Sequence, residues 1–220
     1  MLATLLVTVD QRARQARWLA AATRPGRRLY LATKRGFDLA LCAVGLPVII
    51  PVLALCALAI RIDSPGPALF SQARTGRDGT RFRMYKFRTM VANAEELKPT
   101  LAHLNVLPPP DFKIPNDPRI TRVGRWLRAT SLDELPQLLN VLRGDMSLVG
   151  PRPTSFEPKT YELWHTKRLE IRPGLTGHWQ VGGRHNTTFD ERLRLDLDYM
   201  ARMSLLFDLR IFLRTVRTVL

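Results

Sequence analysis

The sequence contains little cysteine and little histidine. Its two cysteines, Cys42 and Cys56, lie inside one apolar run without polar neighbours, so a disulfide framework and a cysteine-based metal site have no support. This usage is consistent with a reducing, cytosolic compartment. The four histidines lack metal-ligand spacing, and the sequence has no Walker phosphate loop, zinc motif or Ser-His-Asp set. These absences direct attention away from P-loop proteins, zinc enzymes and serine hydrolases.

Acidic residues are scarce relative to basic ones. The 220 residues include 34 Lys and Arg against 19 Asp and Glu, which gives a formal charge of +15 and a pI near 11.1. Such a charge selects negative partners: nucleic acid, an anionic membrane face or a phosphorylated substrate. A hydrophobic content of 45% is sufficient for one domain with a buried core.

Charge is missing altogether from Leu39 to Ile60, a run of 22 residues. A helix rises about 1.5 Å per residue, so this run is long enough to cross a hydrocarbon core of about 30 Å. It begins too late and is too long for a cleaved signal peptide, and no small-residue cleavage motif closes it. The run predicts a membrane segment; a buried hairpin of two core helices in a soluble protein is the alternative.

Two prolines, Pro47 and Pro51, lie near the middle of this run. Each removes a backbone donor and restricts the residue before it, so together they predict a bend inside the membrane. Basic residues flank the run on both sides, and such flanks tend to stay on the cytoplasmic face. A re-entrant helix-hairpin places both flanks there, whereas a single crossing does not. We therefore expect re-entrant insertion of residues 34–62.

Both ends of the chain have patterns that suit a membrane surface. Residues 11–35 contain eight Lys or Arg and no acid. The N-terminal segment, 1–33, is expected to be an interfacial helix on anionic lipid or a solvated basic arm. In residues 204–220, Arg210, Arg214 and Arg217 form one helical stripe beside an apolar stripe. This pattern predicts an amphipathic helix that lies in the membrane interface or packs onto the globular core.

The intervening residues, 63–203, are expected to form a compact cytoplasmic domain, so that all four parts make one functional unit. The turn TGRDG between two short runs with aromatic residues predicts a β-hairpin. The proline-rich stretch 106–121 predicts a loop, and helices are expected at about 91–105, 121–128, 133–142 and from 189 onward. The expected fold class is mainly α with a small β component.

Two adjacent carboxylates, Asp133 and Glu134, stand in the stretch TSLDELPQLLNVLRGD. Pro136 is best tolerated in a first helical turn, so a helix is expected to begin at 131–133 with Asp133 near its N-terminus. Ser131 and Glu134 also match a capping box. Carboxylates in a first turn stabilise a helix by about 0.3–1 kcal/mol, and this ordinary role is one interpretation of the pair. Adjacent side chains on a helix point about 100° apart, so the two carboxylates are expected to have separate tasks.

Arginines around this pair favour a second interpretation, a phosphate site. Arg128 precedes the carboxylates, Arg152 lies between two prolines, and Arg172 precedes Pro173. A residue before proline has less backbone freedom to lose when it meets an anion, and planar guanidinium groups match phosphate oxygens. We expect these cations and the helix dipole to keep Asp133 ionised. That carboxylate is then able to ligate a hard cation or to attack phosphorus.

These residues resemble a known family, the bacterial sugar transferases that are monotopic polyprenyl-phosphate phosphoglycosyl transferases. The resemblance covers about residues 34–213. It is carried, in order, by KRGFDLA before the proline-broken apolar run, YKFRTM, DPRITRVGRWLRATSLDELPQLLNVLRGDMSLVGPRP, RPGLTGHWQVGGR and LDLDY. Family members often have Ser-Pro at the bend, where this chain has Leu46-Pro47. Many relatives also carry further membrane helices upstream, so this chain resembles the minimal form.

The resemblance implies transfer of a sugar-1-phosphate from a UDP-sugar to polyprenyl (undecaprenyl) phosphate, with release of UMP and with Mg²⁺ as cofactor. It implies that Asp133 attacks the β-phosphate and that the lipid phosphate then resolves the phospho-sugar enzyme. Asp133 and Glu134 match the catalytic pair, with Asp133 also expected as the metal ligand. The residues expected to bind substrate or lie beside the site are Lys86, Arg88, Arg128, Arg152, Arg172 and Asp196.

The family likeness also implies a location and partners. The expected place is the bacterial inner membrane, in monotopic form, with the catalytic domain on the cytoplasmic face. Anionic membrane lipid is an expected partner, nucleic acid is not, and a homodimer is compatible with the resemblance. Two alternatives belong to other classes: a membrane-tethered nucleic-acid-binding protein, suggested by the charge, and a non-catalytic scaffold. The basic residues lie mostly beside apolar stretches without a nucleic-acid fold motif, and the intact acidic pair argues against a scaffold.

Overall fold

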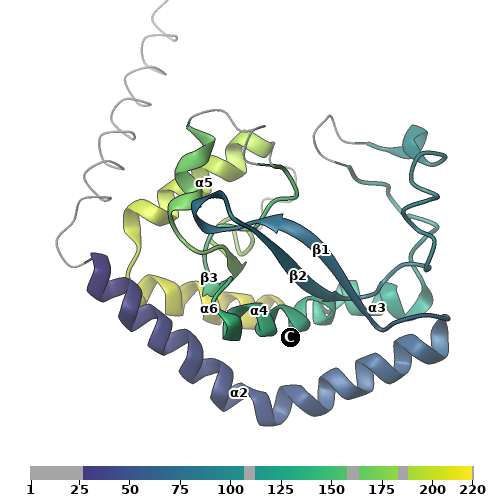
Figure 1. Ribbon diagram of the computed structural model, residues 1–220, viewed down its shortest axis with the longest axis horizontal. Coiled ribbons are helices and arrows are strands. Elements are labelled where there is room, and N and C mark those ends of the chain that lie inside the picture. Colours follow the sequence, from purple (N-terminus) through teal and green to yellow (C-terminus); the bar gives the residue numbers. More distant parts are fainter. Residues whose placement is uncertain (1–26, 107–111, 158–163, 183–187, 220) are drawn as a thin grey trace, which may run out of the picture.

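The computed structural model describes residues 27–106, 112–157, 164–182 and 188–219 (Figure 1). Its helices are α2 (Arg27–Asp63), α3 (Arg122–Ala129), α4 (Leu138–Arg143), α5 (Phe189–Arg202) and α6 (Leu205–Val219). Short 3-10 helices are η1 (Arg77–Gly79), η2 (Ala102–Leu104), η3 (Leu132–Gln137) and η5 (His165–Glu170). The strands β1 (Leu69–Thr75), β2 (Arg81–Phe87), β3 (Ser147–Val149) and β4 (Gly174–Thr176) form two small sheets. The mainly helical fold class is confirmed; the predicted N-terminal interfacial segment lies largely outside the described residues.

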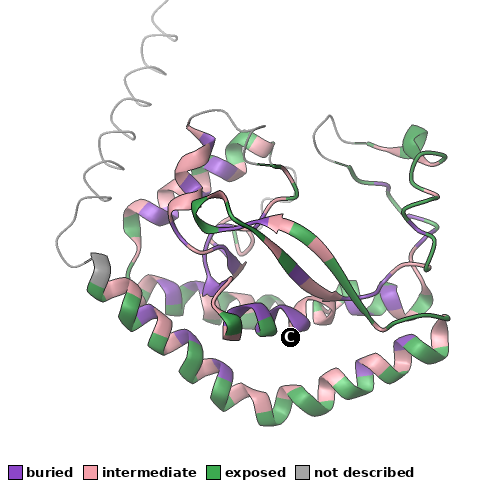
Figure 2. Cartoon of the chain, viewed as in Figure 1, coloured by how far each residue is buried: buried purple, intermediate pink, exposed green. Residues whose placement is uncertain are grey.

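Helix α2 is 37 residues long and contains both Pro47 and Pro51. Figure 1 shows it bent, with both limbs on the side of the bend where the rest of the molecule lies. Its part from Leu29 to Asp63 is long and apolar enough to cross a membrane, and only 11% of its apolar window is buried. Around the bend, Val44, Val48 and Ile50 are exposed (Figure 2). A hairpin in a soluble core would bury these side chains, so the structure favours membrane association, while re-entry itself stays a prediction.

The N-terminal limb of α2 is tied to α6 by a buried polar cluster. The Nζ atom of Lys34 lies 2.9 Å from a carboxylate oxygen of Asp208, whose side chain is 1% exposed. Tyr30 donates to the same carboxylate at 2.7 Å, and Tyr199 of α5 donates to it at 2.6 Å. A buried carboxylate needs partners of this kind, because burial without them disfavours the charged form. The cluster therefore holds three helices together.

Two further charged residues of the KRGFDLA motif attach α2 to the globular part. Arg35 donates to the carbonyls of the last turn of α4, at 2.5 and 3.0 Å, where a cation complements the helix dipole. Asp38 accepts from the hydroxyl of Ser147 at 2.7 Å and from the backbone N–H of Leu148 at 3.3 Å, both in β3. The motif thus fixes helix α2 relative to β3 and α4.

The predicted hairpin is confirmed. Strands β1 and β2 pair antiparallel, with Leu69 opposite Phe87 and Thr75 opposite Arg81. In the connecting turn, Asp78 has a φ of 54°, and the N–H of Gly76 donates to the carbonyl of Thr80 at 2.8 Å.

The prediction of a helix at 91–105 is wrong. The segment forms successive turns and ends in η2. Pro99 has no N–H for the carbonyl of Glu95, which instead accepts from Lys98 at 3.2 Å, a tighter i to i+3 bond. The carbonyl of Ala94 accepts from the guanidinium of Arg119 at 3.0 Å. Of the expected proline-rich loop, residues 107–111 lie outside the described part, and 112–119 form no helix or strand there.

The helix expected at 121–128 is confirmed as α3, but the one at 133–142 is only partly right. Residues 132–137 form the 3-10 helix η3, and α-helical bonding begins at Leu138 in α4. The predicted capping box is also wrong. Ser131 has a φ of 54° and its side chain caps nothing, while the side chain of Glu134 is bound by two cations. The ordinary capping role for Glu134 is therefore excluded.

The core lies where the parallel pair β3 and β4 meets α2, α4, α5 and α6. The turn after β3 crosses the start of β4 so closely that a Cβ on Gly174 would lie 2.1 Å from the backbone N of Gly150. Glycine is thus required at this crossing.

The predicted C-terminal helix is confirmed as α6, and one of its faces packs onto the core, as the alternative proposed. Asp208 and Ile211 are buried against the other elements. The apolar stripe and the neighbouring basic stripe of the prediction both remain exposed on other faces. Their exposed members are Leu206, Leu209, Leu213, Val216, Arg210, Arg214 and Arg217.

Candidate active site

The two predicted catalytic carboxylates lie on η3, which sits beside strand β2. Because η3 is tighter than an α-helix and begins after a left-handed Ser131, Asp133 and Glu134 leave it toward different neighbours. Their side chains are 13% and 19% exposed, so both are partly buried yet reachable from solvent.

Glu134 is held by two cations. Lys86, the lysine of the YKFRTM motif, lies near the end of β2 and donates to Oε1 at 2.7 Å. The guanidinium of Arg152 spans both oxygens, with distances of 2.5 Å to Oε1 and 3.3 Å to Oε2. Burial alone would raise the pKa of Glu134, but the two cations outweigh it and hold that pKa well below its usual range. Glu134 is therefore a fixed anion that orients Lys86 and Arg152.

Asp133 has a different environment. Its nearest cation is the Nζ of Lys86, 4.0 Å from Oδ2, and no described residue forms a hydrogen bond to its carboxylate. Burial raises the pKa of Asp133, and the charges of Lys86, Arg128 and Arg152 offset that effect only in part. The cations therefore oppose the effect of burial on this carboxyl without cancelling it. A carboxylate that is short of hydrogen bonds and desolvated is well suited to react or to take a cation.

Arg128 reaches this site from α3. Its Nε donates to the hydroxyl of Thr89 at 2.8 Å, and its charge acts on Asp133. The approach of α3 is very close: a Cβ on Gly124 would lie 2.1 Å from the carbonyl oxygen of Thr89. The helix can therefore dock at this distance only because residue 124 is glycine.

The backbone of Arg152 is held by Arg168, a residue that the sequence analysis did not single out. Arg168 of η5 donates to the backbone carbonyl of Arg152 and forms a buried ion pair with Asp196 of α5 at 2.6 Å. Burial raises the pKa of Asp196 to about 6, although the charge of Arg168 opposes this shift. A chain of contacts thus runs from Asp196 through Arg168 and Arg152 to Glu134. No motif surrounds Arg168, and only the fold brings it to Arg152.

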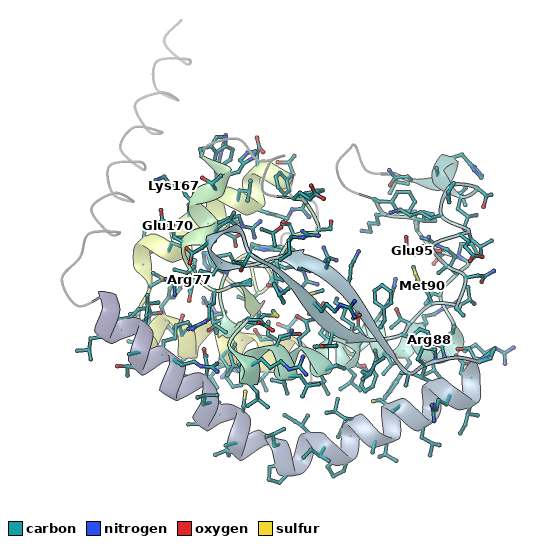
Figure 3. All side chains as sticks on the ribbon, in the orientation of Figure 1. Arg77, Arg88, Met90, Glu95, Lys167 and Glu170 are labelled. Carbon is teal, nitrogen blue, oxygen red and sulfur yellow. The ribbon has the colours of Figure 1, made fainter. Side chains whose placement is uncertain are left out.

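Two of the predicted substrate-binding arginines lie elsewhere. Arg88 is buried beside the C-terminal end of α2 (Figure 3), and its three nitrogens donate to Ser64, Gly66 and Pro67 in the turn after that helix. Arg172 donates from Nε to the carbonyl of Gly144 at 2.7 Å, at the C-terminal end of α4. The structure therefore brings together Lys86, Arg128, Arg152, Asp133 and Glu134, and connects Asp196 to them through Arg168. It does not bring Arg88 or Arg172 to the acidic pair.

At this site, the described residues offer a magnesium ion one available carboxylate, that of Asp133. No cluster of three or more His, Cys, Asp or Glu side chains is present in the part of the chain that the structure describes. Mg²⁺ in phosphoryl-transfer sites needs only one or two carboxylates, because waters and substrate phosphates supply the other ligands. Asp133 meets this need, since Glu134 is already occupied by its two cations.

A carboxylate pair among guanidinium and ammonium groups, in a chain with a helix long and apolar enough to cross a bilayer, is an arrangement that suits a membrane-associated protein with an anionic ligand. The sequence profile described as "Bacterial sugar transferase" matches residues 29–220. The chain therefore belongs to the bacterial sugar transferase family, as the resemblance predicted.

Individual relatives are similar over most of this chain. The "Galactosyl transferase CpsE" of Streptococcus agalactiae is 46% identical over 87% of this chain and 43% of its own length. The "Undecaprenyl-phosphate galactose phosphotransferase" of Salmonella typhimurium is 44% identical over 85% of this chain and 40% of its own. The "UDP-glucose:undecaprenyl-phosphate glucose-1-phosphate transferase" of Caulobacter vibrioides is 45% identical over 85% of this chain and 69% of its own length. The chain thus spans less than half the length of the first two relatives. Their names give no support to the nucleic-acid-binding or scaffold alternatives.

Proposed function

We propose that this protein is a phosphoglycosyl transferase that moves a sugar-1-phosphate from a UDP-sugar to undecaprenyl phosphate. The observation that carries the proposal is the unequal acidic pair. Glu134 is saturated by Lys86 and Arg152, whereas Asp133 beside it has no hydrogen-bond partner among the described residues. The names of the Salmonella and Caulobacter relatives, which specify undecaprenyl phosphate, support the acceptor.

The proposed reaction has two steps at one phosphorus atom. An oxygen of Asp133 attacks the β-phosphorus of the UDP-sugar, the bond to the bridging oxygen breaks, and UMP leaves with that oxygen. A phosphate oxygen of the lipid then attacks the same phosphorus, the bond to Asp133 breaks, and the lipid diphosphate sugar leaves. Both steps bring anions together, so Lys86, Arg128 and Arg152 are needed to lower the repulsion.

Mg²⁺ is proposed as the cofactor, held by Asp133 and by substrate phosphates. When bound there, it would neutralise phosphate charge that the cations of the protein leave uncompensated. Glu134 stays an anion throughout and keeps Lys86 and Arg152 in place, which is a positioning task distinct from that of Asp133.

The proposed location is the cytoplasmic face of the bacterial inner membrane. Helix α2 would enter and leave the bilayer on that face through its bend at Pro47 and Pro51. The exposed apolar stripe of α6 (Leu206, Leu209, Leu213 and Val216), next to its exposed arginines, is suited to the interface of anionic lipid. This arrangement would hold the site beside a lipid acceptor that cannot leave the membrane.

The test is to incubate membranes that contain the protein with undecaprenyl phosphate, Mg²⁺ and a panel of UDP-sugars, and to identify the released nucleotide. We expect UMP with at least one donor. Release of UDP would mean attack at the sugar carbon, and no release from any donor would remove the proposal. A protein with Lys86→Gln and Arg152→Gln serves as the matched control, because it retains Asp133 but lacks the cations.

A further inference from the structure

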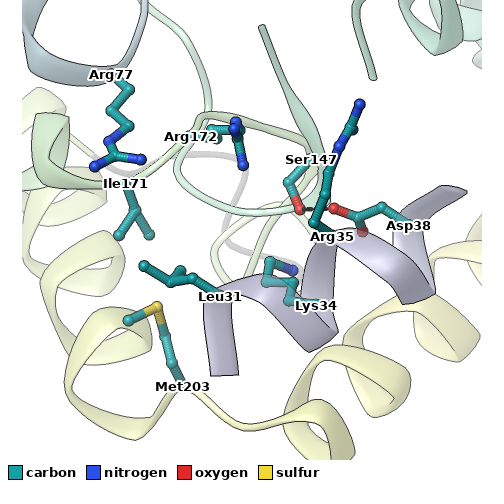
Figure 4. A pocket seen from close by; sticks show the side chains of 9 residues that line it. All are labelled: Leu31, Lys34, Arg35, Asp38, Arg77, Ser147, Ile171, Arg172 and Met203. Atoms are coloured by element: carbon teal, nitrogen blue, oxygen red, sulfur yellow. Dashed lines mark hydrogen bonds between the residues drawn. The ribbon is translucent and has the colours of Figure 1, made fainter. Parts of the chain in front are cut away.

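A second group of cations lines a pocket between α2, the β1–β2 turn and the segment before β4 (Figure 4). Its charged lining residues are Lys34, Arg35 and Asp38 of α2, Arg77 of η1, and Arg172. Four cations and one carboxylate leave this pocket with an excess of positive charge. The cations that act on Asp133 and Glu134 are Lys86, Arg128 and Arg152, so the two groups share no residue.

Part of this charge is already matched. Lys34 is paired with buried Asp208, and Arg35 donates from both terminal nitrogens to the last turn of α4. Asp38 accepts from the hydroxyl of Ser147 and from a backbone N–H of β3, so its carboxylate is directed to the strand. These contacts explain why α2 lies where it does, and they leave Arg77 and Arg172 to be explained.

Within the part of the chain that the structure describes, Arg172 and Arg77 carry hydrogen-bond donors without a partner. Arg172 uses only Nε, on the carbonyl of Gly144, and none of the described residues accepts from its two terminal nitrogens. Arg77 is paired through Nε alone with exposed Asp78 at 3.1 Å. Burial lowers the pKa of Arg172, and the nearby charges of Arg35 and Arg77 lower it further. Three guanidinium groups from three segments thus repel one another around one space.

We propose that this pocket binds a phosphate group, held by the terminal nitrogens of Arg77 and Arg172, as a second anion site apart from the acidic pair. A phosphate oxygen accepts from guanidinium donors with charge-assisted hydrogen bonds and removes the repulsion among them. No covalent step is involved, and the inference does not depend on the proposed transferase activity.

Two sources can supply this chemistry: the headgroup of an anionic phospholipid, or a soluble phosphate such as that of a nucleotide. The other lining residues, Leu31, Ile171 and Met203, form an apolar wall (Figure 4), which suits the glycerol and first methylenes of a lipid. One wall is the N-terminal limb of the proposed membrane helix. The experiment therefore includes one arm for each source.

In the lipid arm, protein in nanodiscs that contain phosphatidylglycerol and phosphatidylcholine is released by detergent, and native mass spectrometry counts the phosphatidylglycerol retained. In the soluble arm, binding of inorganic phosphate and pyrophosphate is measured by titration calorimetry in detergent. All measurements use an Arg152→Gln background, which weakens phosphate binding at the acidic pair. The variants are Arg77→Gln with Arg172→Gln, and Arg83→Gln as a control that removes an exposed cation from the same hairpin.

We expect the double variant to bind at least about tenfold more weakly in one arm, since hydrogen bonds to charged groups are lost. The Arg83→Gln control should retain binding. A loss confined to phosphatidylglycerol identifies a headgroup, and a loss confined to the inorganic anions identifies a soluble phosphate; either supports the site. Equal binding by the double variant and the control in both arms overturns the proposal. Arg77→Lys, with Arg172 intact, keeps the positive charge, so its affinity should lie between those of the double variant and the Arg83→Gln control. Such a graded loss distinguishes a binding effect from a folding defect.

Discussion

At the scale of single residues, the site separates reactivity from positioning. Glu134 is neighboured by two cations at hydrogen-bond distance, while Asp133 is desolvated and has its nearest cation at 4.0 Å. Two adjacent carboxylates thus acquire opposite pKa shifts because η3 directs them to different surroundings. The cations also have separate tasks. Arg152 contacts Glu134 directly, whereas Arg168 contacts only the backbone carbonyl of Arg152 within this group.

Replacement of the proposed nucleophile should abolish the first step. Asp133→Asn is expected to lower UMP release by about three orders of magnitude or more, because the attacking group is lost. Intact-mass spectrometry of the wild-type protein with UDP-sugar and no acceptor should show a phospho-sugar adduct that the variant lacks. Glu96→Gln, which removes an exposed acid outside the site, serves as the control. An adduct of full yield on Asp133→Asn would assign the nucleophile to another residue.

Arg168 is predicted to be a positioning residue. Arg168→Gln should lower kcat by about 10- to 100-fold with little change in KM, because Arg152 loses its support and shifts. The half-buried neighbour Lys167, whose ammonium lies 3.7 Å from Glu170, provides the control Lys167→Gln. Arg168→Gln also leaves Asp196 unpaired, so the double variant with Asp196→Asn should recover thermal stability without recovering kcat. Recovery of both quantities together would mean that Arg168 is only structural.

The buried carboxyl of Asp196 predicts a pH effect on stability. Burial raises its pKa to about 6 in the folded protein from the ordinary value of 3.8, so between these two pH values the folded state holds a proton that the unfolded state has lost. The contribution of Asp196 to stability is therefore full below about pH 4 and declines as the pH rises to about 6, by about 1.4 kcal/mol per unit. Denaturation curves of the wild type minus those of Asp196→Asn should show this fall. A difference that is flat from pH 4 to 7 would contradict it.

At the scale of elements, the sequence predicted those features that local patterns determine. The hairpin followed from TGRDG, the amphipathic helix α6 from its apolar and basic stripes, and the bend of α2 from Pro47 and Pro51. The failures have tertiary causes. A helix over 91–105 is prevented at Pro99 and by Arg119, whose guanidinium takes the carbonyl of Ala94.

Long-range contacts explain what the sequence could not reveal at the site. The pattern S-x-x-E indicates a capping box, yet Glu134 is bound by Lys86, 48 residues away, and by Arg152, 18 residues away. Arg168 could not be identified because its partners are a backbone carbonyl and a buried acid on another element. The residue pattern had already singled out Asp133, Glu134 and Arg152, and the family resemblance gave them roles. Arg172, grouped with the pair because it precedes Pro173, and Arg88, added by the resemblance, do not contact that pair.

The close docking of α3 gives a prediction at this scale. Gly124→Ala places a Cβ against the backbone of Thr89, so α3 must move away and carry Arg128 from the site. We expect a loss of stability of about 1–3 kcal/mol, as for an overpacked core, together with reduced turnover. The matched control is Gly36→Ala in α2, where a Cβ meets nothing within 4 Å and the better helix propensity of alanine should leave stability equal or slightly higher. Equal thermal midpoints for the two variants would contradict the account of α3.

At the scale of the whole molecule, the bent α2 and the exposed stripes of α6 fit one membrane face. The re-entrant topology predicts that both ends of α2 are on the cytoplasmic side. In a background with Cys42→Ala and Cys56→Ala, single variants Thr33→Cys and Arg61→Cys should react with an impermeant maleimide in inverted vesicles but not in intact cells. Labelling of either end in intact cells would mean that α2 crosses the membrane.

The ion pair between Lys34 and Asp208 also bears on how the protein is made. Its two residues are 174 positions apart, so the ribosome adds Asp208 long after Lys34. At about 5–20 residues per second, Lys34 waits roughly 10 to 35 seconds for its partner. During that time α2 has been synthesised, but Asp208, the partner of its Lys34, has not. Membrane targeting can therefore begin before Asp208 has been made, but the helix acquires this contact with α6 only afterwards.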